Sequence, residues 1–140
     1  LAKDFIDGKI STEEILNNKS LTAQWNKLMM EIKKIGRGVQ NYSEEVWNVK
    51  RVKVVLFGCR LKFNQNEKLK QALISTGTSY MVEASPYDKI WGIGLNATDA
   101  QKVASDKWPG QNLLGKILNE LKVEIKSELI KNPQCRERKL

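Results

Sequence analysis

The 140-residue chain contains no histidine. Without an imidazole group, nucleophile schemes that depend on Ser-His-Asp or Cys-His are excluded, and so are most zinc, copper and non-haem iron sites. Any catalysis must therefore use aspartate, glutamate, lysine, tyrosine or bound water. We expect neither a metal nor a cofactor.

Cysteine is scarce, and long apolar runs are missing. The two cysteines, Cys59 and Cys135, lie far apart without a CxxC pair, which is typical of a protein in a reducing compartment. No apolar run approaches the roughly 18 residues of a membrane-spanning helix, and no signal peptide is visible. The sequence predicts a cytoplasmic protein that does not contact a membrane.

The net charge of +8 arises from 24 lysines and arginines against 16 acidic residues. Such a surplus suits a phosphate-bearing ligand or a nucleic acid. It suits equally a lysine-rich solvated surface, which we favour for most of these side chains. Nucleic-acid binding through charge alone is the weakest interpretation, because the chain shows no nucleic-acid-binding motif.

The apolar pattern predicts a predominantly α-helical fold, α+β with a few short strands, in a single domain. Ser11 and Glu14 form a capping box at the start of a short helix. The β-branched residues 52–55 could form a strand, but the acidic turn beginning at Glu44 favours a helix. The other expected elements are a helix over 21–35 stopped by Gly36 and Gly38, a helix after Asn64 or Asn66 ending near Gly77, a short strand over 80–83, and a long amphipathic helix from Gly110 to about Lys131.

Residues 85–95 and 108–116 are the most informative segments. They place the carboxylate Asp88, two tryptophans and several glycines around turns that lead into the last helix. Singly, these residues fit a loop closed by glycine and proline with tryptophans as core anchors. Together they favour a binding or catalytic site. A helix opening at Gly110 would present free N–H groups to an anion, and Gly115 within it indicates close approach of another helix or a ligand.

An ordered series of motifs between about Ile32 and Ile125 resembles the NADAR superfamily, specifically the YbiA-like riboflavin-biosynthesis-intermediate N-glycosidases. The family also carries a Glu-His motif that would stand upstream of Leu1. The resemblance implies a single domain over residues 1–131, incomplete at its N-terminus, followed by a charged tail over 132–140. The matching motifs are Gly36-Arg37, Trp47, Leu61-Lys62-Phe63, Val82-Glu83, Asp88 with Trp91-Gly92 and Gly94, Trp108-Pro109-Gly110 and Asn112-Leu113-Leu114-Gly115.

The resemblance implies an N-glycosidase that hydrolyses the N-glycosidic bond of a phosphoribosylated or ADP-ribosylated heterocycle, such as a riboflavin-biosynthesis intermediate or ADP-ribosyl-guanine. The alternative is a catalytically impaired, shortened paralogue that binds ADP-ribose or a phosphoribosyl ligand. The partner is then a small-molecule phosphoribosyl or ADP-ribosyl substrate, with ADP-ribosylated nucleic acid as a further possible partner.

Roles for individual residues follow from the same resemblance. Asp88, with Glu83 as second candidate, would stabilise an oxocarbenium-like transition state or activate water; Glu83 points either into the site or outward from its strand. The expected substrate-binding residues are Arg37 and Lys62 for phosphate, Trp47 and Trp91 for stacking on the base, Asn112 for ribose or a base edge, and the glycines Gly92, Gly94 and Gly115.

Overall fold

The computed structural model describes residues 1–131, which are predominantly helical, as the sequence predicts. The chain divides into two compact units, Leu1–Glu44 and a second that begins at Glu45. Among the described helices, none is both long enough and apolar enough to cross a lipid bilayer. The predicted charged tail over 132–140, with Cys135, lies outside the described residues.

The first unit contains three helices, α1 (Ala2–Ile6), α2 (Thr12–Asn17) and α3 (Lys19–Arg37). The predicted capping box is confirmed. The Glu14 N–H donates to Ser11 Oγ at 3.2 Å, and the Ser11 N–H donates to Glu14 Oε2 at 2.8 Å. The Ser11 N–H and the Ser11 hydroxyl both donate to Glu14 Oε2, and these two hydrogen bonds lower the pKa of the Glu14 carboxyl. α3 continues through Gly36, where the sequence predicts a stop, and ends before Gly38, the second predicted stop.

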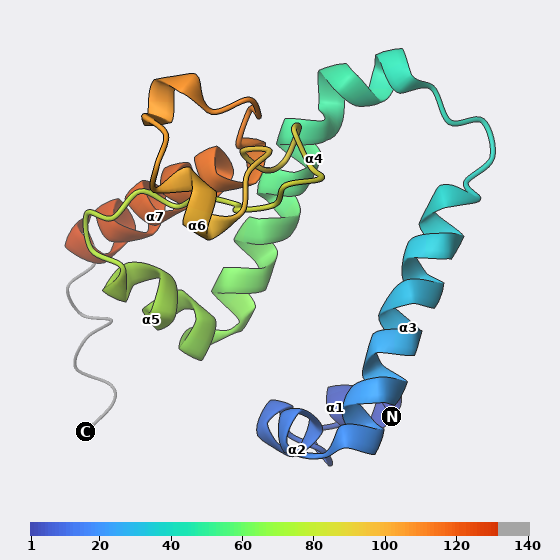
Figure 1. Ribbon diagram of the computed structural model, residues 1–140. Coiled ribbons are helices and arrows are strands. Elements are labelled where there is room, and N and C mark those ends of the chain that lie inside the picture. The colour runs from blue at the N-terminus through green and yellow to red at the C-terminus, as the bar shows by residue number, and fades with distance from the viewer. Residues whose placement is uncertain (132–140) are drawn as a thin grey trace. The chain divides into compact units, whose positions relative to one another are not determined.

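The second unit contains α4 (Glu44–Gln65), α5 (Glu67–Ser75), the single turn α6 (Ala97–Ala100), the 3₁₀ helix η1 (Ser105–Lys107) and α7 (Leu113–Lys131) (Figure 1). The β-branched residues 52–55 lie inside α4, so the helical interpretation is correct. Of the two candidate caps for α5, Asn66 is the one used, because its Oδ1 accepts the Leu69 N–H at 3.1 Å.

The core of the second unit forms where α5 and α7 lie side by side (Figure 1). Leu73 of α5 is buried against Leu121 and Ile125 of α7, and side chains of α4 pack around this cluster. The Arg60 guanidinium of α4 also donates hydrogen bonds to the Glu124 carboxylate of α7, with N–O distances of 2.7 to 3.0 Å. These contacts make α7 the element against which the rest of the unit is arranged.

Cys59 of α4 packs against this core. It is partly buried, and that burial raises the pKa of the thiol. A thiol held protonated in this way is a poor nucleophile and metal ligand.

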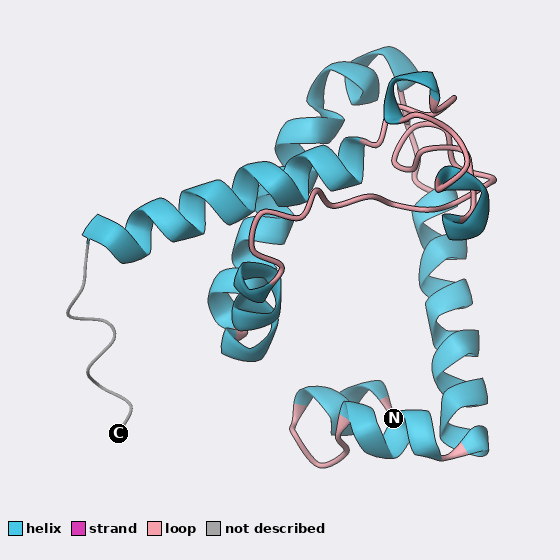
Figure 2. Cartoon of the chain, turned by 60° about the vertical axis from the view of Figure 1, so that its left-hand side comes forward, coloured by secondary structure: helices cyan, strands magenta, loops and turns pink. Residues whose placement is uncertain are grey.

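The expected strand over residues 80–83 does not form, and residues 1–131 contain no strand. The segment passes alongside α7 without regular structure (Figure 2). Side-chain amides of α7 and its entry take the place of a partner strand: Asn119 Oδ1 accepts the Met81 N–H at 3.1 Å, and Asn112 Oδ1 accepts the Glu83 N–H at 3.0 Å. The β-like sequence is therefore satisfied by two asparagines rather than by a sheet.

The last helix begins at Leu113, three residues later than expected. Asn112 has φ of +52°, a left-handed conformation that asparagine tolerates better than most residues. That residue therefore marks the change from loop to helix, and Gly110 belongs to the loop.

Candidate functional site

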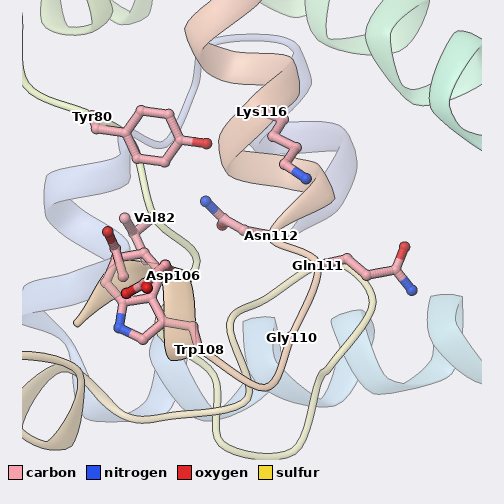
Figure 3. A pocket seen from close by; sticks show the side chains of 9 residues that line it. Tyr80, Val82, Asp106, Trp108, Gly110, Gln111, Asn112 and Lys116 are labelled. Atoms are coloured by element: carbon pink, nitrogen blue, oxygen red, sulfur yellow. The ribbon is translucent and has the colours of Figure 1, made fainter. Parts of the chain in front are cut away.

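A cavity of about 560 Å³ opens in the second unit where α7 begins (Figure 3). Its volume lies within the range of small-molecule sites in proteins. Its lining comes from the segment beside α7, from η1 and the loop after it, and from the first turn of α7. The lining residues are Tyr80, Val82, Ser105, Asp106, Trp108, Gly110, Gln111, Asn112 and Lys116.

Two aromatic rings and two opposite charges line this cavity. In Figure 3 the Tyr80 hydroxyl points toward α7, and the Lys116 side chain extends from that helix. Trp108 is held in place because its indole N–H donates to the Val103 carbonyl at 3.2 Å. Such a set provides stacking surfaces for a heterocycle, a cation for phosphate and a carboxylate for a positively charged reacting centre.

A second cavity of about 490 Å³ adjoins the first. The two share Tyr80, Val82 and Trp108, so one aromatic wall serves both. The remaining lining of the second cavity is mostly small and apolar. It consists of Met81, Ala84, Ala97, Ala100 and Gln101.

Asn112 reaches the cavity lining, but its side-chain amide is committed to the fold. It is only 4% exposed. Its Nδ2 donates to the Met81 carbonyl at 3.1 Å while its Oδ1 accepts the Glu83 N–H. Because both ends of the amide are occupied, Asn112 positions the wall of the cavity, which is a different role from the expected contact with ribose or a base.

The expected anion site of free N–H groups at Gly110 is not present. Five consecutive N–H groups, of residues 110–114, donate to the five consecutive carbonyls of residues 89–93 at 2.8 to 3.1 Å. The loop that carries Asp88 thus caps the start of α7. Amides bound to carbonyls in this way are not available to a phosphate.

The glycines of the predicted site are positions of close contact between main chains. A Cβ on Gly92 would lie 2.8 Å from the carbonyl oxygens of both Asp88 and Glu83, and Gly94 has φ of +74°. A Cβ on Gly115 would lie far inside 3.0 Å of the Met81 carbonyl. The element that approaches Gly115 is therefore the segment beside α7, neither a helix nor a ligand.

Asp88 is anchored by its own turn. Its Oδ1 accepts the N–H groups of Ile90 and Trp91 at 2.9 and 2.7 Å, as the side chain of an Asx turn does. The main chains of Asp88 and Glu83 meet at Gly92. Neither carboxylate, nor the partly buried Trp91, lines the two cavities described above.

The remaining predicted binding residues lie outside both cavities. Arg37 belongs to the first unit, where it lines a smaller hollow of about 310 Å³ with Val39 and Tyr42. Trp47 is partly buried in α4. Lys62 is exposed on α4, with its Nζ 5.6 Å from the ring of its neighbour Phe63.

Three lining residues, Tyr80, Asp106 and Lys116, received no role from the sequence. Tyr80 was expected in a strand, and Lys116 in the last helix without a role of its own. Asp106 stands in a 3₁₀ turn that no periodicity predicts. A weak signal existed, since Lys116 follows the Asn-Leu-Leu-Gly motif directly. The described residues contain no cluster of three or more His, Cys, Asp or Glu side chains able to hold a metal ion.

Comparison with known proteins identifies the family. The model of the NADAR domain matches residues 2–126. The chain belongs to the NADAR domain family. Both cavities lie inside the matched NADAR region, so they are part of the family domain.

Three relatives illustrate the similarity. A protein named N-glycosidase from Acanthamoeba polyphaga mimivirus is 48% identical over 94 residues, which is 67% of this chain and 55% of the viral protein. The protein irg-1 from Caenorhabditis elegans is 38% identical over 98 residues, covering 69% of this chain and 46% of the nematode protein. The chloroplastic riboflavin biosynthesis protein PYRR from Zea mays is 32% identical over 99 residues, 68% of this chain and 14% of the maize protein. The chain thus spans about half the length of the first two relatives.

Proposed function

We propose that this NADAR domain is an N-glycosidase that hydrolyses the bond between a phosphorylated ribosyl group and a heterocyclic base. The observation that carries the proposal is the cavity at the start of α7, where Tyr80, Trp108, Lys116 and Asp106 gather within the matched region. The name N-glycosidase of the viral relative supports the same reaction.

Hydrolysis of an N-glycosidic bond adds the hydroxyl of water to the anomeric carbon and returns a proton to the departing base. The transition state resembles an oxocarbenium ion, which a nearby carboxylate stabilises. In the proposed arrangement Asp106 supplies this charge from the cavity wall and Lys116 holds the phosphate. Glycoside hydrolysis commonly uses two carboxylates. For the second one the family resemblance favours Asp88, and Glu83 is the next candidate.

A binder without catalysis is the second candidate. The observation that favours it is that Asp106 is the single carboxylate among the nine residues lining the larger cavity. A phosphoribosyl or ADP-ribosyl ligand would then be bound and left intact.

The two candidates are separated by product analysis of the 140-residue chain. We would incubate it with phosphoribosyl-amino-pyrimidines, ADP-ribose and ADP-ribosylated guanine in DNA, and follow free base by mass spectrometry in isotope-labelled water. Release of base with label on the sugar, reduced at least about 100-fold by Asp106→Asn, is the expected result. Binding by calorimetry without release would establish the binder, and neither binding nor release would refute both.

Affinity for a phosphorylated ligand is expected to depend on Lys116. A charge-assisted contact contributes about 1.5–3 kcal/mol. Lys116→Ala should therefore lower the affinity for ribose 5-phosphate by about 10- to 150-fold and leave the affinity for ribose itself unchanged. Titration calorimetry measures both.

The matched control for this variant is Lys131→Ala, which removes the same charge from an exposed position at the other end of α7. Arg37→Ala and Lys62→Ala test the resemblance, which implies that Arg37 and Lys62 bind the phosphate. Loss of phosphate affinity in either of those variants, with Lys116→Ala unaffected, would move the phosphate site away from the cavity.

A further inference from the structure

Residues 95–108 form a loop that is hydrogen-bonded only to itself. This 95–108 loop contains α6 and η1 (Figure 1). Its two ends meet, because the Gly110 N–H donates to the Ile93 carbonyl at 2.8 Å. Within residues 1–131, every hydrogen bond that the loop makes ends on another residue of the loop. A compact surface loop with close ends and internal packing is an Ω-loop, a class that is frequently functional.

Hydrogen bonds at both ends of the loop give it a fixed internal shape. Asn96 Oδ1 accepts the Asp99 N–H at 2.8 Å, and Asn96 Nδ2 donates to Asp99 Oδ2 at 2.7 Å. Lys102 Nζ donates to Asp99 Oδ1 at 2.9 Å. The hydrogen bonds from Lys102 and Asn96 lower the pKa of the Asp99 carboxyl. At the other end, the Trp108 indole N–H donates to the Val103 carbonyl at 3.2 Å.

The loop is attached to the rest of the second unit less firmly than the walls that face it. None of its residues is buried. The segment on the other side of the cavities is tied to α7 and its entry, because Asn119 and Asn112 bind the main chain of Met81 and Glu83. Local stability is low where buried apolar contacts are few. The 95–108 loop can therefore separate from the unit without breaking a hydrogen bond of the remaining described residues.

The loop supplies part of the wall of each cavity. In the larger cavity it contributes Ser105, Asp106 and Trp108. In the second cavity it contributes a mostly small and apolar set, which consists of Ala97, Ala100, Gln101 and Trp108. Displacement of the loop would open both cavities together, and its return would bring the Asp106 carboxylate back to the larger one.

We infer that the 95–108 loop is a lid that opens as one piece to admit the ligand and closes over it. Closure of such a lid excludes bulk water and completes the catalytic set only around a bound substrate. The inference rests on the proposed function and adds to it a conformational step that delivers Asp106. Asn96 lines neither of the two cavities, so it is a positioning residue that keeps the lid in its closed shape.

Hydrogen exchange followed by mass spectrometry on the 140-residue chain tests the lid directly. In the free chain we expect the amides of residues 96–107 to exchange at least about tenfold faster than those in the middle of α7, because the loop opens locally. Saturating ribose 5-phosphate should slow the exchange of residues 96–107 at least about fivefold, because closure on the ligand holds the loop in place. Exchange in the second half of α7 should stay unchanged.

Asn96→Ala removes the cap of α6, so a smaller fraction of molecules holds the closed shape and the apparent affinity falls by that fraction. Titration calorimetry should show about three- to tenfold weaker binding of ribose 5-phosphate. The melting temperature should fall by less than about 1 °C, because the loop unfolds separately. Asn96→Ser keeps an acceptor for the Asp99 N–H and should restore most of the affinity.

Asn66→Ala is the matched control, because it removes the same kind of cap from α5, which belongs to the core. Its melting temperature should fall by about 2–8 °C. Its affinity for ribose 5-phosphate, measured well below the melting temperature, should equal that of the parent.

Protection of the first turn of α7 by ribose 5-phosphate without protection of residues 96–107 would overturn the lid and leave the proposed glycosidase standing. Full affinity in Asn96→Ala, or exchange in the free loop as slow as in α7, would do the same. If ribose 5-phosphate neither binds nor slows exchange anywhere, the lid is overturned together with the proposed site. The exchange measurement uses the parent chain, so it does not depend on whether a variant folds.

Discussion

Gly115→Ala is expected to destabilise the second unit by about 3 kcal/mol or more, although alanine is the better helix former. The added Cβ would overlap the Met81 carbonyl and the Asn112 side chain, which lie directly over the helix. Overpacking of this kind costs about 1–3 kcal/mol, and displacing the buried Asn112 amide adds about 1–3 kcal/mol for unmade hydrogen bonds. Chemical denaturation followed by circular dichroism measures the loss.

Gly58→Ala is the matched control for this result. Gly58 lies inside α4, and a Cβ there would meet no atom within 4 Å. The same substitution should therefore stabilise the chain by about 0.5–1 kcal/mol, because alanine loses less conformational entropy in a helix. If the two alanine variants shift stability in the same direction, the close packing of the segment on α7 is incorrect.

The helices could be predicted from sequence because their signals are local. The capping box of Ser11 and Glu14, the Asn66 cap and the apolar stripe of α7 are each contained within a few turns. Residues 80–83 were misassigned because their hydrogen-bond partners stand about 30 to 40 residues later in the chain. Two asparagine side chains that replace a strand leave no periodic signal.

The location of the site could be predicted from the sequence, but the residues that line its cavity could not. Residues 85–95 and 108–116 do lie together, because five amides of the second segment donate to five carbonyls of the first. The same hydrogen bonds remove the free N–H groups that were expected to hold phosphate. The cavity instead depends on Tyr80 and Asp106, which come from a loop and a short 3₁₀ turn. Their positions follow from tertiary contacts, which local patterns do not contain.

Asp88→Asn tests the second carboxylate of the proposed reaction, the one that the resemblance favours, and it should lower kcat at least about 100-fold with little change in melting temperature. The asparagine Oδ1 can still accept the N–H groups of Ile90 and Trp91, so the turn that caps α7 should form normally. Only the negative charge is lost, and a catalytic carboxylate typically contributes 10²–10⁴-fold. Turnover by mass spectrometry and melting by calorimetry are compared on the same preparation.

Asp88→Ala separates the two roles of this side chain. It removes both the charge and the acceptor oxygen, so it should cost about 0.5–2 kcal/mol of stability, as the loss of a capping side chain does, in addition to the activity. If Asp88→Asn retains full turnover while Asp88→Ala loses stability and turnover together, Asp88 acts only by shaping the loop over α7. The catalytic charge would then come from Asp106 alone, the carboxylate that lines the cavity.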